Sequence, residues 1–264
     1  MVEVPHLNTL FEVIHEDDDL LIVHKPADLV CHPTKGDEYS SLISRARIYL
    51  KADKEPRMVN RLDRETSGLV VIAKHAEAAG ELGKIWETRT ITKEYVAIVH
   101  GHVAAERGII DAPLGKDEAS KVAIKDCVRT DGTPAQTEFF VERRFTRNSP
   151  VDSSLAEPFR ADFAIEKKFT LLRLIPRSGR KHQIRIHLSH IGHPIVGDKL
   201  YGGDEDLYLA LVERRLTAEQ RTRLILPTHA LHAGRLRFQW RGRDLDFACA
   251  PEPDFTNFWA GAAA

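Results

Sequence analysis

The chain has 264 residues, of which 42% are hydrophobic and 29% are charged. This length and apolar content can fill a sizeable core, which excludes a disordered tail protein. Because 38 Lys and Arg residues meet 39 Asp and Glu residues, the net charge of −1 excludes a strongly basic coat that would bind any nucleic acid, although a local basic surface is compatible with it.

Short apolar runs and polar turns alternate along the chain and predict its elements in order. The run Leu69–Ala73 is rich in β-branched residues, which indicates a buried strand. The predicted strands are Phe11–Ile14, Leu20–Val23, Leu69–Ala73, Tyr95–Val99, Thr137–Phe140, Thr170–Ile175, Ala233–Trp240 and Leu245–Ala248, the last two joined as a hairpin across Arg241-Gly242. One helix is predicted to begin at a cap on Ser40 or Ser41. A second helix is predicted over Ala76–Thr88.

One later segment fits two kinds of structure. Residues 184–188 alternate like a strand, yet Ile184, Leu188 and Ile191 also share one face of a helix, and we predict the helix because its pattern extends further. A helix would place Lys181 and Arg185 on one face.

The arrangement of elements favours an α+β protein with a mixed, largely antiparallel sheet flanked by helices. The sequence Arg147–Pro158, with Ser, Pro and Asp, predicts a loop. No linker is clear enough to divide the chain. We therefore expect an N-terminal extension over residues 1–10, one domain over residues 11–258 and a tail over residues 259–264, with a separate lobe from the basic second half as the alternative.

The cysteines and the N-terminus predict a soluble protein of a reducing compartment. Cys31, Cys127 and Cys249 lie far apart and are odd in number, so neither a disulfide framework nor a paired-cysteine metal site is indicated. The first ten residues lack a cationic start followed by an apolar run, and no apolar run reaches the roughly 18 residues of a membrane helix. We expect an unexported, cytoplasmic monomer without a membrane segment.

Charge is distributed unevenly along the chain. Residues 1–30 hold seven acidic residues and one basic residue, Lys25. Residues 166–201 hold eight Lys or Arg residues and two acids, and residues 221–243 hold six arginines and no carboxylate. A basic face would attract a polyanion, although a solvated surface is the simpler interpretation of such runs.

The densest group of chemically capable residues is Asn60-Arg61-Leu62-Asp63-Arg64-Glu65-Thr66-Ser67-Gly68. In one interpretation, Asp63 accepts backbone N–H groups near Thr66 in an Asx-type turn, and the arginines are solvated. In the other, Arg61 and Arg64 keep Asp63 ionised in an exposed turn, where it serves as a nucleophile. The spacing alone leaves both open.

The sequence Arg-Leu-Asp-Arg-Glu-Thr-Ser-Gly resembles the signature of the RluA family of pseudouridine synthases. Three further segments stand in the order that this family shows, and the resemblance extends from about Phe11 to about Phe258. These segments are Asp19-Leu20-Leu21-Ile22-Val23-His24-Lys25-Pro26 with Cys31-His32-Pro33, then Lys93-Glu94-Tyr95-Val96-Ala97, then Gly179–Leu188 with Gly192–Asp198.

The resemblance implies a pseudouridine synthase-like fold with a central RNA-binding cleft and a substrate of structured RNA, either tRNA or rRNA, with tRNA slightly preferred because the length and short N-terminus resemble a tRNA-modifying branch of the family. The reaction breaks the N1–C1′ bond of a uridine, turns the uracil and bonds C5 to C1′, with no cofactor, nucleotide or metal. By the family's pattern Asp63 is the nucleophile, Arg185 pairs with it, Tyr95 lies against the uracil and Arg61 fills the space left by the flipped base. The remaining candidates for RNA contact are Arg64, Thr66, Arg180, Lys181, His182 and Gln183.

Two positions depart from the family's pattern. Asn60 stands where His is usual, which puts in doubt whatever that His contacts beside the nucleophile. Asp28 stands where Gly is usual, so either no left-handed backbone is needed there or Asp tolerates it. Eighteen residues precede Asp19, and we expect a stand-alone catalytic domain without the S4-type RNA-binding domain of many relatives.

Other functions remain open. A non-catalytic RNA-binding or RNA-folding protein would keep the scaffold without the chemistry, and a base-removing hydrolase would need a carboxylate pair such as Asp63 and Glu65. If the segment after Lys181 is helical, a phosphate contact of Arg185 competes with its pairing to Asp63. Zinc is disfavoured, because no cysteine accompanies the histidines, which are His187, His190, His193, His229 and His232.

Overall fold

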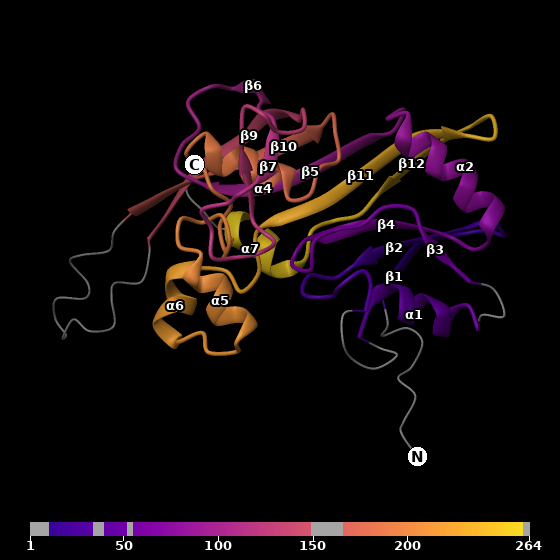
Figure 1. The fold of residues 1–264 in the computed structure, drawn as a ribbon, viewed down its shortest axis with the longest axis horizontal. Coiled ribbons are helices and arrows are strands. Elements are labelled where there is room, and N and C mark those ends of the chain that lie inside the picture. Colours follow the sequence, from indigo (N-terminus) through magenta and orange to yellow (C-terminus); the bar gives the residue numbers. More distant parts are fainter. Residues whose placement is uncertain (1–10, 34–39, 52–54, 149–165, 261–264) are drawn as a thin grey trace, which may run out of the picture. The chain divides into compact units, whose positions relative to one another are not determined.

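The computed structural model describes residues 11–33, 40–51, 55–148 and 166–260 (Figure 1). The described residues form two compact units: unit 1 consists of those within residues 1–95 and 231–252, and unit 2 consists of those within residues 96–230 and 253–264. The chain passes from unit 1 to unit 2 inside one strand, β5 (Thr92–His100). Because this boundary lies inside a strand, the residues there lack the Gly, Pro and Ser that mark a linker, and the sequence does not predict it.

Unit 1 is built on a mixed sheet. Its strands are β1 (Glu12–Glu16), β2 (Leu20–Lys25), β4 (Ser67–Ala73) and β11 (Leu231–Trp240) in that order, with β3 (Arg57–Met58) beside β4 and β12 (Arg243–Ala248) beside β11. These pairs are antiparallel except β4 with β11, which run parallel at Ser67 and His232. The predicted strands of this unit and the predicted hairpin are confirmed.

Strand β4 is apolar from Leu69 to Ala73 because helices cover both faces of its sheet. Every second residue from Leu69 packs in one cluster with α2 (Ala76–Glu87), and the alternate residues Val70 and Ile72 pack in another with α1 (Leu42–Tyr49). Figure 1 shows the two helices on opposite sides of β4 and β2. A strand covered on both faces needs a continuous apolar run, as the sequence predicts. Ser41 caps α1, which confirms the predicted helix start.

Unit 2 contains two long antiparallel strands, β9 (Gln136–Asn148) and β10 (Glu166–Pro176), and β6 (Arg107–Asp111) pairs with β9. Two short strands pair separately, and the described part of the unit also contains four helices. These elements are β7 (Leu114–Lys116), β8 (Asp126–Val128), α4 (Gln183–His190), α5 (Asp206–Val212), α6 (Ala218–Leu224) and α7 (Pro253–Ala260). The α+β class and the predicted helix after His182 are confirmed.

Several sequence predictions need correction. Residues 147 and 148 belong to β9 and not to a loop, and the rest of the predicted loop, residues 149–158, lies outside the described residues. Helix α7 runs to Ala260, so the predicted tail does not begin at residue 259. The basic second half is not one lobe, because residues 231–252 return to unit 1. Among the residues that the structure describes, no helix has the length and apolar character needed to cross a bilayer.

Gly68 is required by the parallel pairing of β4 with β11. Its φ is +120°, and a Cβ at this position would lie 2.3 Å from the carbonyl oxygen of Ala233. Backbone conformations of this kind cost other residues about 1–3 kcal/mol. Rotation of a side chain cannot relieve the overlap, because the obstructing atom belongs to the backbone.

Replacing Gly68→Ala should therefore lower the free energy of unfolding by at least about 2 kcal/mol. Gly80→Ala is the matched control, because a Cβ at Gly80 in α2 meets nothing within 4 Å. Ala is favoured over Gly inside a helix by about 0.5–1 kcal/mol, so this variant should be more stable than wild type. Urea unfolding measures both variants, and wild-type stability of Gly68→Ala would contradict the close approach of the two strands.

Candidate active site

Asp63 lies in the loop between β3 and β4, and Asn60 anchors the start of that loop. The side-chain amide of Asn60 donates a hydrogen bond to the carbonyl of Leu69 at 3.1 Å and accepts one from the N–H of Val71 at 2.8 Å. Asn60 thereby continues the pairing of β3 with β4 in place of a backbone peptide. The residue that departs from the family's pattern contacts the strand that follows Asp63, and it fixes the direction in which the loop leaves the sheet.

A buried lysine holds the next part of the loop. Lys25, the last residue of β2, is 0% exposed, and its Nζ donates to the carbonyls of Pro26 at 2.7 Å, Leu29 at 2.8 Å and Arg64 at 3.0 Å. Burial lowers the pKa of Lys25 to about 8, and Asp63 is among the nearby anionic groups that oppose this shift. The ammonium is thus largely charged at pH 7, with an acceptor for each of its three protons.

Two further contacts fix the residues on either side of Asp63. The N–H of Leu62 donates to Sγ of Cys31, and the Cys31 thiol donates to the carbonyl of Leu62, both at 3.4 Å. Arg64 forms an exposed ion pair with Asp28, with 2.7 Å between Nε and Oδ1. Asp28 has a φ of +65°, so the backbone there is left-handed and Asp tolerates it.

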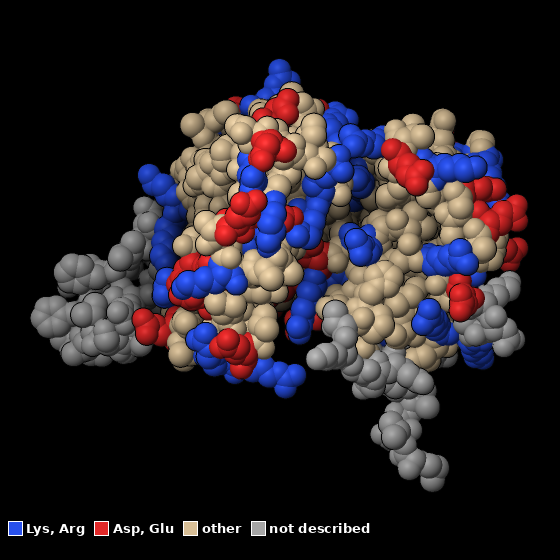
Figure 2. Space-filling view, viewed as in Figure 1, with Lys and Arg blue, Asp and Glu red and all other residues tan. Residues whose placement is uncertain are grey.

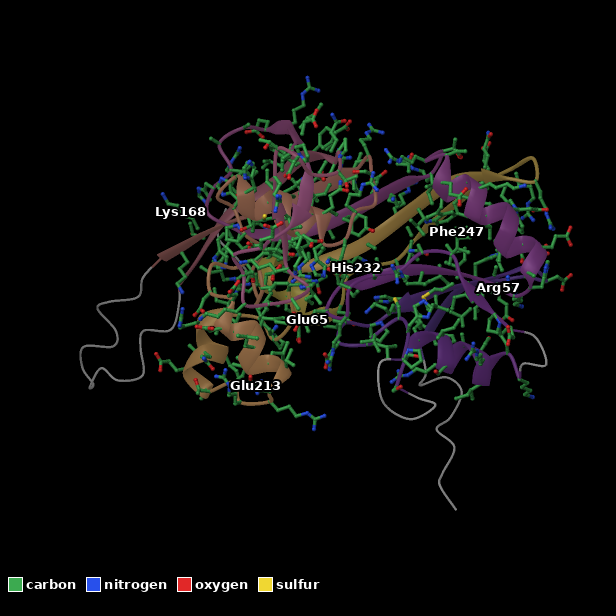
Figure 3. All side chains as sticks on the ribbon, in the orientation of Figure 1. Arg57, Glu65, Lys168, Glu213, His232 and Phe247 are labelled. Atoms are coloured by element: carbon green, nitrogen blue, oxygen red, sulfur yellow. The ribbon has the colours of Figure 1, made fainter. Side chains whose placement is uncertain are left out.

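The loop ends in a turn that runs into β4. The N–H of Thr66 donates to the backbone carbonyl of Asp63 at 3.2 Å, and the Ser67 hydroxyl lies 2.9 Å from Nδ1 of His232. Figure 3 labels His232, which belongs to β11. Thr66 is only 2% exposed, so it helps to hold this turn, and its contact with RNA stays a prediction. Asp63 is half-buried, whereas the side chain of Arg61 is exposed.

Tyr95 on β5 is half-buried and interacts electrostatically with Asp63. Burial raises the pKa of the Tyr95 phenol, and the negative charge of Asp63 raises it further. Because Coulomb interactions weaken with distance, this effect indicates that the two side chains lie near each other in unit 1. A phenol that stays neutral at pH 7 can donate a hydrogen bond and stack on a base, but it does not supply a resident phenolate.

Arg185 on α4 of unit 2 binds Asp198 through two hydrogen bonds. Nε donates to Oδ2 at 2.7 Å and Nη2 donates to Oδ1 at 2.9 Å, and both residues are buried. Burial acts to raise the pKa of Asp198, but the charge and hydrogen bonds of Arg185 hold that pKa well below its usual range. The sequence pattern does not predict this partner, and the pairing of Arg185 with Asp63 stays a prediction.

Gln183, another predicted RNA contact, is 4% exposed and bonded within unit 2. Its Oε1 accepts from the Ser178 hydroxyl at 2.7 Å and from the N–H of Arg180 at 3.1 Å. Its Nε2 donates to the carbonyl of Gln136 and to Oγ1 of Thr137, both at 2.9 Å. The amide holds the turn before α4 in place, and its direct contact with RNA stays a prediction.

The other three candidates of unit 2 precede α4. Arg180 and Lys181 are exposed, and Lys181 pairs with Asp126 at 2.9 Å. His182 is the N-cap residue, with a left-handed φ of +55°. Because Lys181 lies in the turn and not in the helix, it does not share a helical face with Arg185, and that expectation is wrong.

The arginines of residues 221–243 do not form a purely basic surface. Most of them are paired with carboxylates: Arg223 with Asp204, Arg235 with Asp246, Arg237 with Glu94, and Arg241 with Asp19 and Glu81. Figure 2 shows acidic and basic side chains side by side over α2 and the β11–β12 hairpin. The positive charge available to a phosphate backbone is therefore smaller than the sequence count suggests.

The chain belongs to the RNA pseudouridylate synthase family, whose model matches residues 19–190. It is 35% identical over 248 residues to the ribosomal large subunit pseudouridine synthase D of Vibrio vulnificus, covering 92% of this chain and 67% of that protein. It is 35% identical over 199 residues to the protein of the same name from Haemophilus ducreyi, covering 74% and 54%. The chain thus spans between about half and two thirds of these relatives, and the family resemblance is confirmed.

Two solved human structures share the fold. The RNA Pseudouridylate Synthase Domain Containing 1 structure matches with a TM-score of 0.69 at 23% identity, over 99% of this chain and 91% of that one. The Domain Containing 4 structure matches with a TM-score of 0.65 at 24% identity, over 93% and 90%. Both confirm the predicted fold.

His187 on α4 gives the stability of the protein a pH dependence. Its Nδ1 lies 2.9 Å from Oγ1 of Thr137 and its Nε2 lies 3.0 Å from the carbonyl of Ala112, and burial lowers its pKa below the ordinary 6.5. The unfolded chain therefore takes up this proton at a higher pH than the folded chain does. The free energy of unfolding should decrease as the pH falls below about 6.5.

Substituting His187→Gln should make this decrease shallower, because glutamine does not titrate. His190→Gln is the control, since His190 lies on the same helix but is exposed. Burial affects the pKa of His187 more than the charge of His190 does, so the decrease in this variant should stay close to that of wild type. Urea unfolding between about pH 5 and pH 7.5 measures all three proteins. An unchanged slope in His187→Gln would show that this histidine titrates alike in the folded and unfolded chains.

Proposed function

We propose that this protein is an RNA pseudouridine synthase that isomerises uridine in structured RNA, with Asp63 as its nucleophile. The observation that carries this proposal is the way in which the loop is held. Contacts through Asn60, Leu62, Arg64 and Thr66 anchor both sides of Asp63, which remains half-buried at the loop surface. A nucleophile held in one geometry avoids the entropic cost of being ordered during the reaction.

The chemistry needs a carboxylate that forms a covalent bond and later releases it. The N1–C1′ bond breaks, the C5–C1′ bond forms, C5 loses a proton and N1 gains one, so no atom of the nucleotide is lost. Attack of Asp63 at C1′ and attack at the uracil ring both return the carboxylate unchanged. Tyr95, neutral at pH 7, would contact the uracil as a hydrogen-bonding and stacking partner.

Recognition of RNA would depend on base flipping, because a stacked uracil is not accessible to a carboxylate. Arg61 is exposed and makes no hydrogen bond or ion pair with the residues that the structure describes, which suits a side chain that enters the space left by the flipped base. Arg180 presents a second exposed guanidinium, in unit 2. The resemblance also assigns Arg185 to the catalytic machinery. Its two hydrogen bonds to Asp198 would keep its guanidinium in a fixed orientation.

We propose ribosomal RNA as the substrate class in preference to tRNA. This choice is supported by the curated relatives, whose names identify ribosomal large subunit enzymes. A cytoplasmic location and a monomeric state are the matching expectations for such an enzyme and stay predictions.

Asp63→Asn and Asp63→Ala should each lower pseudouridine formation by at least about 1,000-fold, because neither side chain can act as the nucleophile. Asp18→Asn is the control, since Asp18 is an exposed carboxylate of the β1–β2 turn in the same unit. Pseudouridine is measured by mass spectrometry in large-subunit rRNA from a deletion strain complemented with each variant. Wild-type pseudouridine levels with Asp63→Asn would overturn the proposal, and release of uracil would favour a base-removing hydrolase.

Arg61→Ala should lower the single-turnover rate by about 10- to 100-fold while RNA affinity changes by less than about threefold, because the lost side chain stabilises the flipped state and not the initial complex. Arg57→Ala removes an exposed arginine of β3 in the same unit and should change neither quantity. Rapid-quench assays and filter binding give the two numbers. An equal loss of rate and affinity in Arg61→Ala would instead assign Arg61 to phosphate binding.

A further inference from the structure

Three potential metal ligands from distant parts of the sequence meet in unit 1. His24 lies on β2, His232 lies on β11 and Cys249 directly follows β12. Their ligand atoms all lie within 4.8 Å of one another, with 3.5 Å between Sγ of Cys249 and Nε2 of His232. The two imidazole rings meet edge to face with their centroids 5.5 Å apart. None of the three residues takes part in the proposed chemistry.

The hydrogen bonds of His24 leave one ring nitrogen available as a ligand. Its Nδ1 lies 3.0 Å from Oε2 of Glu12, and because a carboxylate only accepts, Nδ1 carries the proton and Nε2 holds a lone pair. Nε2 is buried and has no hydrogen-bond partner among the described residues. A buried acceptor without a partner is costly, and a carboxylate on one ring nitrogen is the usual way in which proteins aim the other at a metal ion.

The other two residues are compatible with metal ligation. His232 is fully buried, and its hydrogen bonds are those of a neutral imidazole, the form in which histidine binds metals. Its Nε2 donates to the carbonyl of Cys249 at 3.0 Å, while Nδ1 accepts from the Ser67 hydroxyl. Cys249 is a free cysteine, and a metal ion deprotonates a thiol that coordinates it.

We propose that His24, His232 and Cys249 bind a divalent transition-metal ion of the zinc type, with water as the fourth ligand. Two imidazoles and one thiolate suit Zn²⁺ and do not suit Ca²⁺ or Mg²⁺, which prefer oxygen ligands. On binding, the Cys249 proton leaves to solvent and the His232 proton moves from Nε2 to Nδ1, from which it donates to Ser67. Zn–N bonds of about 2.0–2.1 Å and a Zn–S bond of about 2.3 Å place tetrahedral ligand atoms about 3.3–3.6 Å apart. The Cys249 and His232 atoms, 3.5 Å apart, already meet this spacing, and the more widely separated ligand atoms would close in by about 1 Å.

The proposed ion would have a structural effect in unit 1. It would join β2, β11 and the segment after β12, which are far apart in the chain. Through the hydrogen bond between His232 and Ser67, it would also reach the end of the loop that carries Asp63. An ion that binds only the folded chain raises its stability by mass action.

The test uses the full chain, stripped with a chelator and titrated with Co²⁺ as a spectroscopic probe and then with Zn²⁺ as a competitor. Wild type should bind one Co²⁺ with a thiolate charge-transfer band, and Zn²⁺ should displace it. His24→Ala and Cys249→Ser should each weaken binding by at least about 10-fold, and Cys249→Ser should lose the band. Glu12→Gln should weaken binding by about 10- to 100-fold, because it removes only the carboxylate that orients His24.

Two substitutions serve as controls, Cys127→Ser for another unpaired cysteine and His190→Ala for an exposed histidine, and both should bind Co²⁺ as wild type does. Circular dichroism confirms that each variant is folded, and Zn²⁺ should raise the Tm of wild type but not that of Cys249→Ser. Absence of the thiolate band in wild type, or wild-type affinity in Cys249→Ser, would overturn the proposal. No RNA is present in this assay, so its outcome is independent of whether the protein makes pseudouridine.

Discussion

The candidate active site depends on one buried ammonium group. Lys25 has no exposed surface, and its three carbonyl acceptors belong to the segment that follows β2 and to the loop that carries Asp63. Replacing it with an apolar side chain would leave three carbonyls without their donor, each at a cost of about 1–3 kcal/mol if it stays buried. Because Lys25 is itself a sheet residue, the position of the loop follows from the position of the strand.

Local patterns predicted the elements well, because the periods of helices and strands are visible in the sequence. The apolar run at Leu69 indicated a buried strand, and the spacing of Ile184, Leu188 and Ile191 correctly favoured a helix over a strand. The ion pair of Arg185 with Asp198 was not predictable in the same way. It depends on how the turn after α4 folds back, and a spacing of 13 residues has no characteristic meaning.

Charge counts along the sequence were a poorer guide, because they ignore neighbours across a sheet. Arg237 stands opposite Asp246 in the β11–β12 ladder, and Asp246 also pairs with Arg235. Exposed pairs of this kind contribute about 0–1 kcal/mol to stability. In each pair, however, the carboxylate cancels the positive charge that the arginine would otherwise present at the surface. The arginines of the hairpin are thus largely balanced by neighbouring carboxylates, in keeping with the net charge of −1 for the whole chain. Recognition of RNA would then fall on a few exposed cations near the chemistry, such as Arg61.

The alternation of β2 links the loop and the proposed metal ligands. His24 pairs with Leu69 and shares the α2 face of the sheet, whereas its neighbour Lys25 faces the opposite side and holds the loop. On the other edge of β4, His232 stands beside Ser67. The two histidines therefore flank the same end of β4, and an ion between them would bind only when β2, β4 and β11 are assembled. At a concentration 1,000-fold above its Kd, such an ion would stabilise that assembly by about 4 kcal/mol. The strands that position Asp63 are the strands that would gain this stability.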